Sequence, residues 1–162
     1  MNVYLELYGR IPPLVREVVD GLDADGLTRR VGPDANPIGW LVWHLTRVED
    51  HHIAELLEAE QLWIADGWAE RFGMTPADPD DIGYGHTSEQ VAAVPATDAA
   101  LLVAYHEAVD VRTRAFLADH GDLDRIVDRR WDPPVTLGVR LVSVADDALQ
   151  HLGQAAYVRG LL

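Results

Sequence analysis

The chain has 162 residues, of which 48% are apolar and 25% charged, so it is long enough for one folded domain and excludes a disordered or collagen-like chain. Acidic residues number 27 and basic residues 13, and the formal net charge of −14 excludes a nucleic-acid partner because no basic stripe offsets it. We therefore expect a single domain over residues 1–162.

The first predicted element is a helix over residues 2–21, with its apolar side chains largely on one side. Pro12 and Pro13 interrupt this pattern, so the helix either kinks there or begins at Pro12. Turn-forming residues make 23–37 a connection. No basic cluster precedes an apolar stretch at the start, and no run approaches the roughly 18 apolar residues of a membrane span. We expect a cytoplasmic protein without a membrane partner.

The second predicted element is a helix that Asn36 caps and Pro37 begins, and that runs to about Glu58. Its apolar residues recur at helical spacing. Residues 60–86 break this pattern with glycines, prolines and three large aromatic residues. They predict a long ordered loop with short helical turns, and loops of this length in compact domains are often functional.

Two further helices follow. Ser88 caps a short turn before Pro95, Thr97 caps a third helix over residues 98–120, and residues 122–135 form another connection. Thr136 begins a fourth helix that extends to the C-terminus. Four long amphipathic segments, with no convincing alternating strand, predict an all-α four-helix bundle.

Three residues have the pattern of a metal site. Asp147 and His151 are four residues apart on the fourth helix, so their side chains rise from adjacent turns of one face. His44 lies among core-facing residues of the second helix, so we expect it to point inward. Two histidines and one carboxylate leave coordination positions open for water or substrate, as a catalytic zinc or iron site requires. His51 and His52 are competing partners, with surface positions as their alternative.

The composition narrows the chemistry further. The chain contains no lysine and no cysteine, which excludes Schiff-base chemistry, cysteine nucleophiles, disulfides and cysteine-ligated metals. Its two serines, Ser88 and Ser143, lie outside any G-x-S-x-G turn, so serine hydrolase chemistry is not expected. A bound metal must therefore be held by histidine and carboxylate side chains.

Three segments carry a resemblance to a known family: residues 38–52 around His44, residues 83–91, and residues 151–160, which begin with a His-x-Gly-Gln motif. Together they resemble the DinB/YfiT-like superfamily. More narrowly, they are similar to actinobacterial members related to the N-terminal domain of mycothiol-dependent maleylpyruvate isomerase and to DinB-type thiol transferases. The similarity covers nearly the whole chain.

The resemblance implies an up-down-down-up bundle that holds a divalent metal through His44, Asp147 and His151. Zinc is the expected ion, with nickel or iron as alternatives. Relatives have a histidine or glutamate at the position of Asp147, and aspartate is about one methylene shorter. Three outcomes stay open: Asp147 coordinates directly, coordinates through water, or leaves the site weak.

The resemblance also implies mycothiol as cosubstrate, deprotonated on the metal and transferred to an electrophilic acceptor, with His44, Asp147 and His151 as the catalytic residues. The acceptor is a xenobiotic or an unsaturated acid, and the loop over 60–86 shapes its pocket. Gln154 is expected to hydrogen-bond a metal ligand or bound water, and Arg47 to receive an anionic substrate group.

Two other functions remain open: a hydrolase that uses metal-activated water, and a non-catalytic metal-binding protein of a stress response. We also expect a homodimer, because five tryptophans are more aromatic surface than one four-helix core readily covers. The net charge opposes this association, so it should tighten as salt screens the repulsion.

Overall fold

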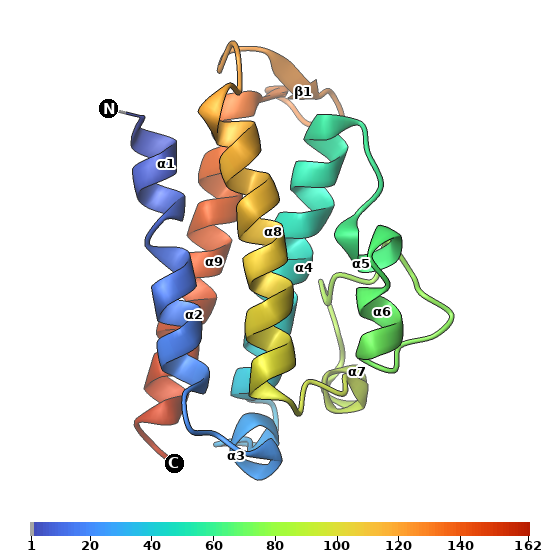
Figure 1. The fold of residues 1–162 in the computed structure, drawn as a ribbon, viewed down its shortest axis with the longest axis vertical. Coiled ribbons are helices and arrows are strands. Elements are labelled where there is room, and N and C mark those ends of the chain that lie inside the picture. The colour runs from blue at the N-terminus through green and yellow to red at the C-terminus, as the bar shows by residue number, and fades with distance from the viewer. Residues whose placement is uncertain (1) are drawn as a thin grey trace.

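The computed structural model describes residues 2–162 and is built almost entirely from helices (Figure 1). Its elements in chain order are α1 (Val3–Tyr8), α2 (Ile11–Val19), α3 (Ala24–Thr28), α4 (Ile38–Leu57), α5 (Leu62–Ala65), α6 (Trp68–Arg71), α7 (Ser88–Ala93), α8 (Ala99–Ala118), β1 (Ile126–Asp128), β2 (Val135–Thr136) and α9 (Leu137–Arg159). Among residues 2–162, no helix has both the length and the hydropathy needed to cross a lipid bilayer.

Four long rods form the bundle, the first made of α1 and α2 and the others of α4, α8 and α9 (Figure 1). The first rod runs in one direction, α4 and α8 both run in the opposite direction, and α9 returns. This is the up-down-down-up order that the family resemblance implied. Because α4 and α8 are parallel, the chain between them must return along the bundle, and it does so through α5, α6 and α7 beside α4.

The helix boundaries follow local capping chemistry, with small corrections to the predictions. The first helix divides in two, and α2 begins at Ile11, so the proline pair marks a helix start. No side chain caps α4, so the prediction that Asn36 caps this helix is wrong. Asp98 caps α8 in place of Thr97, because its carboxylate accepts bonds from the first free backbone N–H groups. Thr136 caps α9 as predicted.

A short two-stranded sheet, absent from the predictions, lies in the connection before α9. The strands β1 and β2 pair antiparallel, with Ile126 opposite Thr136 and Asp128 opposite Val135. Strands of three and two residues are too short to show an alternating pattern in a sequence. Likewise, Thr87 caps α7 in a reciprocal capping box with Gln90, so the prediction that Ser88 is the cap is wrong by one residue.

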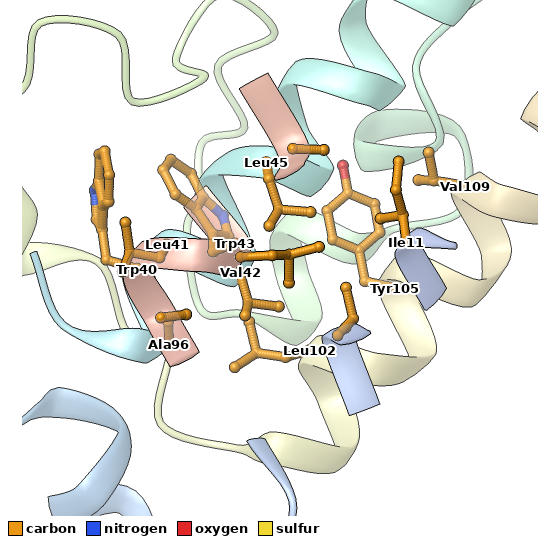
Figure 2. Close-up of a cluster of buried hydrophobic side chains, with 14 of the residues drawn as sticks. Ile11, Trp40, Leu41, Val42, Trp43, Leu45, Ala96, Leu102, Tyr105 and Val109 are labelled. Atoms are coloured by element: carbon orange, nitrogen blue, oxygen red, sulfur yellow. The ribbon is translucent and has the colours of Figure 1, made fainter. Parts of the chain in front are cut away.

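Helix α4 is the centre of the molecule, and 15 of its 20 residues are buried. It packs against α8 and α9 on one side, and the segment with α5 to α7 covers its other side (Figure 1). Figure 2 shows its side chains meeting those of α2 and α8 in the core. With the α5 to α7 segment packed over α4, four of the five tryptophans are buried, while Trp131 is 66% exposed. The aromatic surface from which the homodimer was predicted is therefore mostly core.

Candidate metal centre

The structure brings His44, Asp147 and His151 together between α4 and α9. His44 is 5% exposed, and each residue offers a ligand atom within 4.8 Å of the other two. His44 Nε2 lies 3.9 Å from Asp147 Oδ1, and His151 Nε2 lies 3.5 Å from the same oxygen. The two imidazole rings are 4.8 Å apart at 78°. The inward direction expected for His44 and the shared face of Asp147 and His151 are both present.

Each imidazole makes a hydrogen bond on the side away from Asp147, and this bond fixes which ring nitrogen faces Asp147. The Nδ1–H group of His44 donates to the backbone carbonyl of Ile82 at 2.5 Å. The Nδ1–H group of His151 donates to the side-chain oxygen of Gln154 at 2.8 Å. Both Nε2 lone pairs are therefore free on the side of Asp147, the arrangement typical of metal-binding histidines. Gln154 thus lies where the sequence placed it, against a triad histidine.

The surroundings shift the pKa values of the two imidazoles in opposite directions. Burial lowers the pKa of His44, and this outweighs the bond to Ile82 and the charge of Asp147. Burial also acts to lower the pKa of His151, but the hydrogen bonds to Asp147 and Gln154 and the charge of Asp147 outweigh it and raise that pKa. His44 is accordingly neutral at pH 7, with a lone pair available for a cation, while at His151 a cation competes with a proton for the Nε2 lone pair.

The donor set fits a divalent cation. Asp147 Oδ2 is buried without a hydrogen-bond partner, and such an atom is costly unless a further group satisfies it. Two imidazole nitrogens and one carboxylate are the ligands of catalytic zinc sites and of non-haem iron sites. Three protein ligands leave positions open, and a cavity of about 200 Å³ adjoins His44 and Asp147.

Aromatic and loop residues around His44 were not predicted from the sequence. Trp40 stacks on the His44 ring at 4.7 Å and 9°, and its indole N–H donates to His86 Nδ1 at 3.3 Å. His86 Nε2–H donates in turn to Asp81 Oδ1 at 2.7 Å. The i, i+4 spacing of Trp40 and His44 is the one signal that could have placed them together. The bonds to His86 and Asp81 depend on loop geometry that no spacing reveals.

A second group of potential ligands, His51, His52 and Glu55, is less suited to a cation. The side-chain amide of Gln61 donates to His51 Nδ1 at 3.0 Å, which leaves the proton of that ring on Nε2. The guanidinium of Arg140 donates to the ring of His52 at 3.2 Å. One lone pair in each ring is therefore engaged, and Arg140 adds a positive charge beside the group.

Arg47, predicted to bind an anionic substrate group, lies elsewhere. Its side chain is fully buried and donates to the Gln61 side chain at 2.7 Å. It also donates to the backbone carbonyls of Pro79 at 3.1 Å and Asp81 at 3.2 Å. These bonds satisfy its donors from within the protein. Arg47 therefore anchors the 60–86 segment to α4, and this explains why a charged residue occupies the core.

Two comparisons with known proteins found matches to this chain. A family model described as mycothiol-S-transferase matches residues 13–162. A crystal structure described as a conserved protein from Enterococcus faecalis is similar in fold, with a TM-score of 0.89 and 31% sequence identity. That similarity covers 97% of this chain and 93% of the other. No protein with a curated description matches this chain.

Proposed function

Because this chain belongs to the mycothiol-S-transferase family, we propose that it transfers the thiol of mycothiol to an electrophilic acceptor at a cation held by His44, Asp147 and His151. The observation that carries the proposal is the pair of free Nε2 lone pairs facing Asp147, whose second oxygen has no partner. Without cysteine, the chain has no thiol nucleophile of its own, so a cosubstrate thiol is a chemically consistent source.

A divalent cation bound in such a set lowers the pKa of a coordinated thiol and so supplies a thiolate at neutral pH. The protein residues do the positioning. Ile82 and Gln154 orient the two imidazoles, and Asp147 adds the one negative charge of the donor set. The adjoining cavity holds the acceptor against the triad. We propose zinc as the cation, with nickel or iron as alternatives, because these ions share the same donor preferences.

The test compares conjugation rates with and without thiol in metal-loaded protein. With 1-chloro-2,4-dinitrobenzene as acceptor, we expect turnover that requires mycothiol and is lost after chelation. Thiol-independent turnover of an ester would instead identify a hydrolase, and metal binding without turnover of either kind would identify a binding protein. The reaction consumes a reduced thiol, which is the form that cytoplasmic conditions maintain, so we propose the cytoplasm as its location.

The triad is tested separately by metal content. His151→Ala should lose the bound metal measured by elemental analysis, because it removes one of three ligands. His120→Ala is the matched control, since His120 lies beyond α8 and bonds to the carbonyl of Gly121. Equal metal loss in the two variants would show that the metal binds elsewhere.

A further inference from the structure

The cavity beside the triad has apolar walls. Its volume is about 200 Å³, and His44 and Asp147 form part of its lining. Three aliphatic residues line it as well, Val48 on α4, Val144 on α9 and Ile82 in the loop between α6 and α7, together with His52, Tyr84 and Ser143. An apolar protein cavity of about 150 Å³ is large enough to bind benzene, so this one has room for a single substituted ring.

The same cavity has no cationic side chain in its lining, among the residues that the structure describes. His52 lines it two helical turns beyond His44, about 12 Å along α4. Burial and the charge of Arg140 lower the pKa of His52 to about 4, so this ring is neutral at pH 7. The guanidinium of Arg140 lies behind it, bonded to His52 at 3.2 Å and to Asp128 at 3.0 Å.

The charge of the centre itself does not favour an anion either. Asp147 contributes one negative charge, so a divalent cation with a bound thiolate sums formally to zero. An anionic acceptor would lose its hydration on entering an apolar cavity and would find no opposite charge to compensate. With Arg47 committed to the loop carbonyls, the residue expected to receive such an anion is also absent from the cavity.

Tyr84 lines the mouth of this cavity and is 90% exposed. It is the second residue of a tight turn, closed by a bond from the His86 N–H to the Gly83 carbonyl at 3.2 Å. Gly83 and Gly85 flank it with φ of 88° and 74°, and the bond from His86 to Asp81 fixes the base of the turn. The turn fixes the backbone at Tyr84, and its exposed ring, with only two side-chain torsions, is available to make apolar contact with a ligand at the cavity.

We propose that the acceptor is a small, uncharged electrophile of one ring that lies between Val48 and Val144 and is covered by Tyr84. This acceptor class presupposes the thiol transfer proposed above, and it favours the xenobiotic type of acceptor over the unsaturated acid. With a benzylic chloride, the sulfur–carbon bond forms as the carbon–chlorine bond breaks. Chloride leaves with the bonding electron pair, and the thiol proton passes to water.

The charge preference is tested by binding, without any chemical step. 4-Nitrotoluene and 4-methylbenzoate have nearly the same shape and differ by one negative charge. Isothermal titration calorimetry at pH 7.5 on the metal-loaded protein saturated with mycothiol, so that the thiolate occupies the open coordination position, should give a Kd at least tenfold lower for 4-nitrotoluene. Equal affinity, or tighter binding of 4-methylbenzoate, would overturn the proposal.

Substitutions at the cavity rim test the proposed contacts. Ser143 is exposed, lines the cavity and bonds only to the Val139 carbonyl of its own helix, so a longer side chain is accommodated there. Ser143→Arg should tighten 4-methylbenzoate binding about tenfold, and Ser143→Gln, of similar length but neutral, should not. Tyr84→Ala should weaken 4-nitrotoluene binding by about tenfold, while Tyr84→Phe retains it. Tyr157→Ala, at an exposed tyrosine further along α9, is the matched control.

Turnover separates this inference from the proposed function. The paired substrates are 4-nitrobenzyl chloride and 4-(chloromethyl)benzoate, each rate being divided by its uncatalysed rate with mycothiol. We expect the neutral substrate to show the larger acceleration by at least tenfold. Similar acceleration of both would overturn the neutral-acceptor proposal and leave the transferase intact. Selective binding with no acceleration of either would overturn the transferase assignment and, with it, the acceptor class.

Discussion

At the residue scale, the orientation of each triad histidine depends on one hydrogen-bond acceptor on the far side of its ring. For His44 this acceptor is the backbone carbonyl of Ile82, which a substitution of the Ile82 side chain does not remove. For His151 it is the side chain of Gln154, within the same helix. The second case is open to direct test, because outer-shell acceptors of this kind tune metal affinity through ligand orientation and basicity.

Gln154→Leu removes the acceptor for the His151 Nδ1–H and should weaken metal binding about tenfold or more. Gln154→Glu keeps an acceptor at this place and should retain the affinity. Competition with a chromophoric chelator gives the dissociation constants. Gln150→Leu is the control, since Gln150 is exposed on α9 and bonds to Asp146. If Gln154→Leu binds as tightly as Gln150→Leu, the bond to Gln154 does not orient the ligand.

Glu49 makes the stability of the bundle depend on pH. Both carboxylate oxygens are buried without a partner, and burial raises the pKa of Glu49 from 4.5 to about 7. Between these values the folded state holds a proton that the unfolded state has lost, so stability falls as pH rises through this window. The free energy of unfolding falls by about 3 kcal/mol once the pH exceeds the pKa of Glu49 in the folded state.

Glu49→Gln removes this ionisation and should leave the free energy of unfolding nearly unchanged at pH 4.5. At pH 8 the variant should be more stable than the parent by about 3 kcal/mol. Urea unfolding at the two pH values measures the difference, and histidine titrations common to both proteins cancel. Glu17→Gln, at an exposed position of α2, should show no such pH-dependent gain. A gain of equal size at both pH values would contradict the assigned cause.

At the scale of elements, the loop around Gly83 is part of the triad because its backbone touches α4. A Cβ atom at Gly83 would lie 2.8 Å from His44 Nδ1 and 3.0 Å from both Trp40 and Trp43. Gly85 has a similar positive φ, but no atom lies within 4 Å of its Cβ position. Both glycines therefore have a positive φ that favours glycine, but only at Gly83 would an added methyl group collide with neighbouring side chains.

Gly83→Ala should lower both thermal stability and metal affinity, because the loop must move away from His44 and withdraw the Ile82 carbonyl. Gly85→Ala carries only the backbone strain, about 1 kcal/mol, and should bind metal normally. Calorimetric melting and chelator competition give the two quantities. Normal metal affinity in Gly83→Ala would show that this loop does not position the histidine.

The helices were predictable because their signals are local. Helical periodicity places Asp147 and His151 on one face, and the apolar neighbours of His44 direct it inward. The partners of these residues were not predictable. The Ile82 carbonyl and the Asp81 to His86 bond depend on the path of a loop, and burial of Arg47 depends on carbonyls more than 30 residues away. Long-range contacts of this kind leave no periodic trace in a sequence.

At the scale of the whole molecule, α9 carries apolar residues at a spacing from which we expect two copies to pair. Val142, Leu149 and Ala156 follow one another at seven-residue spacing; Val142 is 52% exposed, Ala156 is exposed, and Leu149 between them is half-buried against the core. Seven-residue spacing is the spacing of a seam between two helices. This spacing replaces the tryptophans as the reason to expect a homodimer, because most of those are buried.

Sedimentation equilibrium should show a homodimer that tightens as salt rises from 50 to 500 mM, since salt screens the repulsion between two copies of charge −14. Val142→Asp should weaken the association at least tenfold. Val111→Asp, which introduces the same charge at an exposed valine of α8, should not. A monomer at tens of micromolar under both salt conditions would exclude the dimer.

The triad joins parts of the chain that a ribosome makes at different times. Asp147 follows His44 by 103 positions, and both other residues of the triad lie on α9. A nascent chain exposes His44 long before it has either partner. Under the proposed function, metal loading would therefore be a late event of biogenesis, and a product truncated before α9 would lack both Asp147 and His151.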